Sequence, residues 1–315
     1  MKIGLYSITY QGIWYRGQAL GIREFVTQAK RLGYDGVEID GKRPHANPMD
    51  LDGGARSAIR EHLAHEGMEL FAIAANNDFS SPVPEHRENE MLMVRELIHL
   101  ARDLGAPVVR LFAAWPGVTL RDGVATYEMA RAAWQRGFPD TTTEERWEWV
   151  RACLAEVSTI AEQAGIVLAL QNHAPVIESY KDMLQLIDEV NSPALKACLD
   201  LPLLKRQDDA WVHQAAQETA DRQVLSHFGG EYERTADGSV EPFKFAGPFQ
   251  PDYNYPAFVQ AMHRIGYDGF ISYELCHPVF VPGTRRRADL EYVHAQAALA
   301  LEYMRGLIGS ERDTR

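Results

Sequence analysis

Cysteine is scarce in this sequence of 315 residues. The three cysteines, Cys153, Cys198 and Cys276, lie far apart, and none belongs to a CxxC pair. A disulfide framework and a structural zinc site of the CxxC type both need regularly spaced cysteines. The sequence therefore favours a reducing compartment, and we expect free, buried thiols.

Clustered positive charge and long hydrophobic runs are also missing. The net charge is −12 and the 32 Lys and Arg residues are scattered, so the chain should repel a nucleic-acid backbone. No apolar run approaches the length of a transmembrane helix, and the apolar start at residues 1–8 is too short for a secretory signal. We therefore expect a cytoplasmic protein with neither a nucleic acid nor a membrane as partner.

No GxGxxG motif of a dinucleotide-binding sheet follows the first apolar run. Instead, a helical pattern that ends at glycine and leads into a short apolar run recurs at residues 31–39, 65–73, 104–112, 163–171 and 264–272. Such a glycine is typical of a helix C-terminus that precedes a buried strand. With three further strands at 2–8, 195–200 and 223–228, the chain has eight predicted strands.

Helices of period 3.6 fill the gaps between these strands. They are predicted at 21–33, 53–67, 86–105, 143–165, 178–191, 209–221, 255–266 and 285–308. Apolar strands alternating with helices indicate a parallel sheet, and eight of each predict an α/β fold of the (β/α)8 TIM barrel type. An open doubly wound sheet is the alternative.

The barrel is expected to form one catalytic domain over residues 1–308, followed by a tail at 309–315. Two connections, residues 114–142 after the fourth strand and residues 228–255 after the seventh, are longer than a βα turn requires. Because each follows a strand, we expect both on the C-terminal face, where barrel enzymes hold their sites.

Polar residues end four of the apolar runs: Gln171, Asp200, His227 and Glu274. In a barrel these strand ends meet at one rim, and a buried carboxylate is costly unless it is paired or binds a metal. The oxygen-rich set with one imidazole favours Mn²⁺, with Mg²⁺ or Co²⁺ as alternatives. A hydrogen-bonded network without metal is the other interpretation, and Gln171 is either a ligand or an amide that orients one.

Further residues are expected to act near this rim. His173 shares a strand face with Gln171, which places it to remove a proton next to a carbonyl, although a substrate-binding histidine is the alternative. Substrate binding is predicted for Trp14, Trp115, Glu38, Lys42, His45 and Arg110. A solvated loop is the alternative for Lys42 and His45, and Arg110 is also expected to pair with a buried carboxylate.

The barrel and its four strand-end residues resemble the xylose-isomerase-like superfamily of sugar isomerases and epimerases. This resemblance covers essentially the whole chain. Members of the superfamily hold one divalent ion through Glu, Asp, His and Glu, and the resemblance implies that Gln171, Asp200, His227 and Glu274 stand at these four positions here. In 3-epimerase-like members the first and last glutamates are also the acid–base pair, which implies a catalytic Glu274. Gln171 departs from this pattern, and because an amide cannot take a proton it argues against a symmetric two-glutamate epimerase.

A narrower resemblance comes from four segments: GIWYRG at 12–17, EIDGKRPHANPMD at 38–50, QNHAP at 171–175 and YELCHP at 273–278. They are similar to segments of the catalytic α subunits of bacterial C-glycoside deglycosidases. That resemblance implies cleavage of the C–C bond of a 3-oxo-C-glycoside, a divalent ion, His173 as base and a small second (β) subunit.

The sequence thus predicts a metal-dependent carbon–carbon lyase that acts on a sugar conjugate. One alternative is a sugar (phosphate) isomerase or 3-epimerase. The other is a catalytically silent barrel that binds a sugar or scaffolds a complex.

Overall fold

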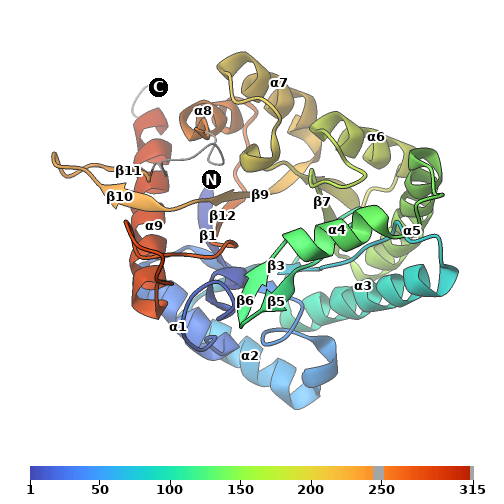
Figure 1. Cartoon of the computed structure of the whole chain (residues 1–315), viewed down its shortest axis with the longest axis horizontal. Coiled ribbons are helices and arrows are strands. Elements are labelled where there is room, and N and C mark those ends of the chain that lie inside the picture. The colour runs from blue at the N-terminus through green and yellow to red at the C-terminus, as the bar shows by residue number, and fades with distance from the viewer. Residues whose placement is uncertain (244–251, 313–315) are drawn as a thin grey trace.

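The computed structural model describes residues 1–243 and 252–312. Eight parallel strands close into a barrel (Figure 1). In their order around the barrel they are β1 (Lys2–Tyr6), β12 (Phe270–Glu274), β9 (Gln223–Gly229), β8 (Leu195–Cys198), β7 (Val167–Gln171), β4 (Val108–Leu111), β3 (Glu69–Ala74) and β2 (Gly36–Asp40). The predicted (β/α)8 barrel is confirmed.

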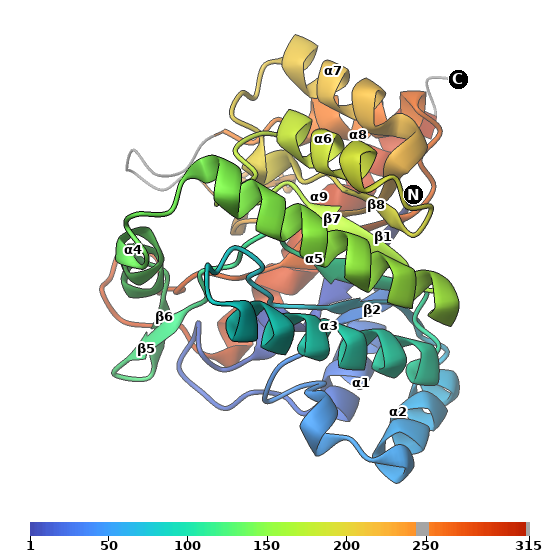
Figure 2. The same cartoon turned by 90° about the vertical axis from the view of Figure 1, so that its right-hand side faces the viewer.

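Helices cover the outside of the barrel (Figure 2). They are α1 (Ile22–Leu32), α2 (Gly53–Glu66), α3 (Pro84–Leu104), α5 (Thr143–Ala164), α6 (Tyr180–Val190), α7 (Asp209–Thr219), α8 (Tyr255–Arg264) and α9 (Leu290–Arg312). Glycine ends α1 and α3 as predicted, since Gly33 and Gly105 adopt φ values of 96° and 85° that favour residues without a Cβ. The last helix begins at Leu290 rather than at the predicted residue 285.

A small apolar cluster fills the barrel interior below the C-terminal ends of the strands. Phe71 of β3 and Phe270 of β12 stack with ring centroids 3.9 Å apart. The other members are Ala72, Ala169, Cys198 and Leu225. Gly4 of β1 makes room for the cluster, because a Cβ there would lie 2.3 Å from the Phe71 ring. Apolar side chains therefore fill the barrel interior, and polar strand residues lie above them at the C-terminal ends of the strands.

Both long connections carry secondary structure of their own. The one after β4 holds the hairpin β5 (Thr119–Arg121) and β6 (Val124–Thr126), followed by α4 (Glu128–Arg136). The one after β9 holds the hairpin β10 (Tyr232–Arg234) and β11 (Val240–Pro242), which projects from the barrel (Figure 1).

Parts of two predicted regions lie outside the described residues. These parts are residues 244–251 of the second long connection and residues 313–315 of the predicted tail. Residues 309–312 of that tail continue α9. The assignment of one domain to residues 1–308 stays a prediction.

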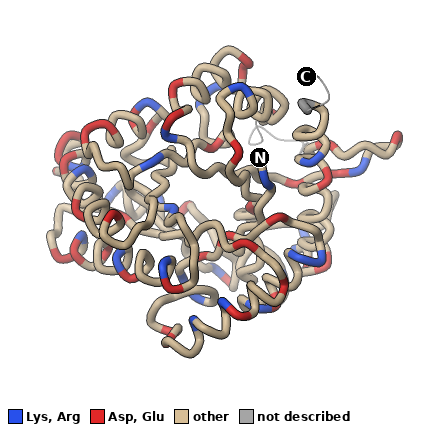
Figure 3. The backbone as a smooth tube through the Cα atoms, turned by 180° about the vertical axis from the view of Figure 1, so that it is seen from behind, with Lys and Arg blue, Asp and Glu red and all other residues tan. Residues whose placement is uncertain are grey.

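Charged residues of both signs are spread over the outer elements (Figure 3). None of the helices in the described part of the chain combines the length and the apolar character needed to cross a bilayer.

A partly buried pair of acids lies where α4 is fixed to the barrel. Trp134 of α4 donates from Nε1 to Ser80 Oγ at 3.2 Å, and Ser80 Oγ donates to Asp78 at 2.6 Å. The backbone N–H of Asp78 in turn donates to Glu90 Oε2 of α3 at 3.4 Å. Burial raises the pKa of Glu90 to about 7, so folding favours its protonated form.

We expect Glu90→Gln to change how stability depends on pH. Because the pKa of Glu90 rises from 4.5 to about 7 on folding, its contribution is fully present below about pH 4.5 and is lost as the pH rises through about 7. A neutral amide does not titrate, so the variant should lose less stability than the wild type over this window. Urea unfolding at both ends of the window measures the difference. Glu88→Gln, at an exposed position of the same helix, is the control, and parallel profiles for Glu90→Gln and wild type would contradict the assignment.

Candidate functional site

A cavity of about 620 Å³ opens at the C-terminal ends of the strands. Its polar lining includes Lys42, Asn76, Arg110, Gln171, His173, Asp200 and Glu274. Its apolar lining includes Ile8, Trp14, Phe112, Trp115, Val118, Tyr127 and Leu203. The connection after β4 supplies Trp115, Val118, Tyr127 and Arg131, so the long segment forms one wall. The volume lies within the range of small-molecule sites.

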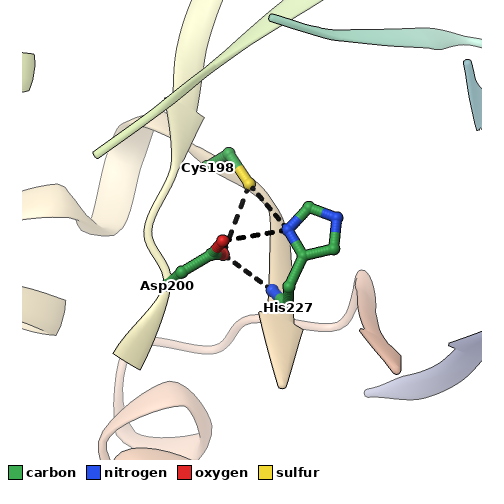
Figure 4. A group of neighbouring side chains, drawn as sticks. All are labelled: Cys198, Asp200 and His227. Carbon is green, nitrogen blue, oxygen red and sulfur yellow. Dashed lines mark hydrogen bonds and ion pairs between the residues drawn. The ribbon is translucent and has the colours of Figure 1, made fainter. Parts of the chain in front are cut away.

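Asp200 and His227 form the buried centre of this end of the barrel (Figure 4). His227 Nδ1 lies 3.0 Å from Asp200 Oδ2, and the backbone N–H of His227 donates to Asp200 Oδ1 at 2.7 Å. Cys198 Sγ lies 3.4 Å from Asp200 Oδ1 and 3.5 Å from His227 Nδ1. One potential ligand atom from each of the three residues can be chosen so that all lie within 4.8 Å of one another.

A second carboxylate faces the other ring nitrogen of His227. His227 Nε2 lies 2.8 Å from Glu38 Oε2. Both ring nitrogens of His227 face carboxylate oxygens, and an ionised carboxylate can only accept a hydrogen bond. Either both ring nitrogens therefore carry a proton, or a cation lies between one ring nitrogen and the carboxylate that it faces. Although burial lowers it, the carboxylates of Glu38 and Asp200 raise the pKa of His227 well above its ordinary value. The arrangement therefore requires positive charge on His227 or beside it.

Glu38 also contacts Arg110, which lies under the cavity. Arg110 Nε lies 3.7 Å from Glu38 Oε1, and its guanidinium donates to the Tyr6 hydroxyl at 2.7 Å and to the carbonyl of Ala75 at 3.1 Å. The guanidinium carbon lies 4.3 Å from the centroid of the Phe112 ring. Arg110 thus places a cation beside Oε1 of the fully buried Glu38 carboxylate, while His227 faces Oε2.

Gln171 ends β7 beside this pair. Its Nε2 donates to Asp200 Oδ2 and lies 3.5 Å from His227 Nδ1. Its Oε1 is buried and has no hydrogen-bond partner among the described residues. A half-turn of the amide exchanges the two atoms, and the carbonyl oxygen then faces Asp200 and His227 as a ligand would.

Glu274 ends β12 and lines the same cavity. Burial raises the pKa of Glu274 to about 7. The group formed by Cys198, Asp200 and His227 does not include Glu274, whose expected role as a metal ligand stays a prediction.

His173 lines the cavity just after β7. Its ring meets those of Phe112 and Trp115 edge-on, with centroids 5.2 and 4.9 Å away. Its Nδ1 donates to the carbonyl of Ala174, which leaves a lone pair on Nε2. Burial lowers the pKa of His173 to about 4, so the ring is neutral at pH 7 and able to accept a proton.

The order of the strands places these groups relative to one another. Around the barrel β7, β8, β9 and β12 follow in that sequence. His173 therefore lies on one side of Asp200 and His227, and Glu274 lies on the other. A small molecule held above the buried centre would have a proton carrier on each side.

The chain matches the model of the xylose isomerase-like TIM barrel family over residues 26–301. It belongs to that family. Fructoselysine 3-epimerase of Shigella flexneri is 26% identical over 210 residues, which cover 64% of this chain and 66% of the relative, just under two thirds of its length. D-psicose 3-epimerase from Clostridium cellulolyticum H10 is similar in structure, with a TM-score of 0.70, 17% identity and coverage of 98% and 99% of the two chains. The structure of the IOLI protein with a bound zinc atom gives a TM-score of 0.68 at 17% identity, with 99% of both chains covered.

These comparisons correct the function predicted from sequence. The relatives with a named activity, fructoselysine 3-epimerase and D-psicose 3-epimerase, are sugar epimerases and not carbon–carbon lyases. The expected cleavage of a C-glycoside was inferred from four short segments and from an amide at position 171. The relatives agree with the alternative, a sugar isomerase or epimerase.

The residues of this xylose isomerase-like barrel fit a divalent ion. Ligands of one ion lie roughly 3.0–3.5 Å from one another when metal–ligand bonds are about 2.1 Å long. The contact of His227 Nδ1 with Asp200 Oδ2 (3.0 Å) meets this spacing, and so does the 3.5 Å from Nδ1 to the Gln171 amide nitrogen, whose place the carbonyl oxygen takes after a half-turn. The unpartnered amide oxygen and the need for positive charge on or beside His227 agree with it. Asp200, His227 and Gln171 would hold the ion, with Glu38 orienting His227 from behind.

The predicted substrate-binding residues divide into two groups. Lys42, Trp14 and Trp115 line the cavity, as does Arg110. Glu38 and His45 do not line it, which differs from the prediction. Glu38 points from the centre of β2 toward His227, and His45 is buried with its Nε2 bonded to the carbonyl of Leu20 at 3.1 Å.

Sequence reasoning missed two features of the site, Tyr127 and Cys198, and it left open whether His277 reaches the cavity or lies in a loop. Tyr127 stacks on Trp14 with centroids 5.5 Å apart, and its hydroxyl donates to the carbonyl of Cys276. His277 lines the cavity with its Nε2 3.4 Å from Glu231 Oε1. Cys198 faces the buried centre. Only Cys198 had a readable signal, because strand alternation places it on the same side as Asp200 two residues later.

Proposed function

We propose that this chain is a sugar epimerase that inverts a carbon next to a ketone. One observation carries the proposal: His173 and Glu274 line one cavity and flank Asp200 and His227. Inversion requires removal of a proton from one face of the carbon and its return on the other, and this arrangement supplies one carrier for each face.

His173 Nε2, with its free lone pair, accepts the proton on the β7 side. Glu274 delivers a proton on the β12 side, and in the reverse direction the roles exchange. When bound, the divalent ion supplies Lewis-acid polarisation of the substrate ketone. The amide of Gln171 does not hinder this scheme, because the acid–base role lies two residues further on, at His173.

The substrate class follows from the rest of the cavity. Lys42 Nζ, held by Asn76 Oδ1 at 3.2 Å and Asp40 Oδ2 at 3.5 Å, offers donors to sugar hydroxyls. The stacked pair Trp14 and Tyr127 and the neighbouring Trp115 form an apolar wall that excludes water. A keto sugar that carries a substituent fits this lining, in agreement with a relative whose substrate is fructoselysine.

Proton exchange in D₂O tests the proposal. Metal-loaded protein is incubated with free ketoses and with keto glycosides, and NMR follows both the appearance of an epimer and deuterium at the inverted carbon. We expect an epimer that carries deuterium. Asp200→Asn, which removes a carboxylate from the buried centre, controls for a contaminating epimerase. A product in which the carbonyl has moved to another carbon, or the absence of exchange across the panel, would contradict the proposal.

A further inference from the structure

Cys198 occupies a position that packing alone does not explain. Its Sγ lies 3.4 Å from Asp200 Oδ1 and 3.5 Å from His227 Nδ1, and Figure 4 shows the three side chains converging. A thiol that only donated a hydrogen bond to Asp200 would need one of these contacts. Its near-equal distance to the carboxylate and the imidazole is the spacing of a third ligand. For Zn–S and Zn–N bonds of about 2.3 and about 2.0 Å, a tetrahedral angle gives a separation of roughly 3.5 Å.

Gln171 provides an independent observation at the same point. Its side chain is only 3% exposed and its amide is directed at Asp200 and His227, yet Oε1 has no hydrogen-bond partner among the described residues. Gln171 and Cys198 are paired in the register of β7 and β8, so both reach the buried centre from adjacent strands. After a half-turn of the amide, which brings Oε1 to the place that Nε2 now holds, a cation there would be bound by both the amide oxygen and the sulfur.

We propose that Cys198 is a sulfur ligand of the metal ion, so that the site prefers Zn²⁺ or another thiophilic ion over Mn²⁺ and Mg²⁺. Sulfur ligands select zinc and similar ions, whereas carboxylate and water oxygens suit magnesium and manganese. On binding, the Cys198 thiol loses its proton to solvent and the sulfur forms the bond to the metal. This proposal replaces the Mn²⁺ expected from sequence, where Cys198 was taken for an inert thiol.

The sulfur–metal bond has a spectroscopic signature that does not depend on turnover. The metal-free full-length protein is titrated with Co²⁺, and the near-ultraviolet absorption is recorded. We expect a sulfur-to-cobalt charge-transfer band in the wild type, and its loss in Cys198→Ser. Absence of the band in cobalt-loaded wild type overturns the proposal without any variant, so a folding defect cannot obscure the result.

Metal affinities give a second measurement. We expect Cys198→Ser to weaken Cd²⁺ and Zn²⁺ binding by at least ~10-fold, as for other groups that hold a metal site, while Mn²⁺ binding changes much less. Cys153→Ser, the same change at a buried position in α5, is the matched control and should leave the band intact. If the band persists in Cys198→Ser but disappears in Cys276→Ser, the sulfur ligand is Cys276, which lines the cavity, and the proposal is refuted.

The inference concerns the ion that the proposed epimerase would use, and the two can fail separately. A charge-transfer band without epimerisation of any sugar leaves the sulfur ligand standing and rejects the function. If the protein epimerises a sugar but its cobalt form lacks the band, the proposed function stands and the sulfur ligand is rejected.

Discussion

Replacing Glu274 by glutamine should lower kcat by ~10²–10⁴-fold, the usual contribution of a positioned acid–base group, with a much smaller change in KM. The amide keeps the size and polarity of the side chain, so contacts with the sugar are preserved. It cannot carry a proton, so delivery on the β12 side is lost. Steady-state kinetics in both directions measures the effect.

Isotope exchange makes this prediction sharper. If two groups serve opposite faces, Glu274→Gln should still exchange the proton of the epimer that His173 deprotonates, although inversion stops. His173→Asn should show the complementary pattern, with exchange confined to the other epimer. Glu88→Gln, at an exposed position of α3, should behave like the wild type. Equal exchange of both epimers in both variants would show that one group serves both faces and would refute the assignment of roles.

The barrel itself was readable from the sequence because local signals repeat. Five helices that end at glycine each lead into an apolar run, and together with three further apolar runs they predict eight strands, which leave few topologies. The polar residues Gln171, Asp200 and His227 were found for a related reason. A polar side chain that ends a buried strand must meet others at the rim of a closed sheet.

Partners across the barrel were not readable, because they depend on register. Glu38 and His227 are 189 residues apart in sequence, and their contact requires β2 to be placed correctly against its neighbours. The pairing of β2 with β3 shifts between Val37 and Glu38, and that of β8 with β9 shifts between Ala197 and Cys198. Such irregularities re-aim side chains, and sequence alternation does not reveal them. For this reason the sequence analysis predicted that Glu38 binds the substrate, whereas in the structure Glu38 contacts His227.

The predicted lyase was wrong for a different reason. Short segments and a single amide were weighed more heavily than the barrel as a whole. The cavity lining shows why the amide misleads: Gln171 and His173 both line the same cavity, so a histidine at 173 can serve the side of the cavity that a glutamate at 171 would serve. Loss of one acid–base residue does not by itself change the reaction when its neighbour on the same face can carry the proton.

Removing the guanidinium beneath the cavity should be the most damaging single change to stability. We expect Arg110→Met to lower the free energy of unfolding by ~3–5 kcal/mol, because Oε1 of the buried Glu38 carboxylate loses its cation and only Oε2 keeps a partner in the described residues, His227 at 2.8 Å. Glu38 is fully buried, and its Oε1 has no hydrogen-bond partner among the described residues. The ion pair with Arg110 Nε, at 3.7 Å, is the contact that Oε1 makes. Methionine matches the aliphatic part of the side chain, so the loss should reflect charge rather than volume. Urea unfolding at neutral pH measures it.

A double variant separates the charge from the packing. Glu38→Gln removes the buried charge that needs the guanidinium, so Arg110→Met should cost much less in that background, and the two changes should be strongly non-additive. Arg95→Met, which breaks an exposed ion pair with Glu96, should cost no more than about 1 kcal/mol. Additive losses in the Glu38 and Arg110 cycle would mean that the arginine acts through its bonds to Tyr6 and Ala75 instead. In that case Tyr6→Phe should reproduce a large part of the loss, because it removes the hydroxyl that accepts from Arg110 at 2.7 Å.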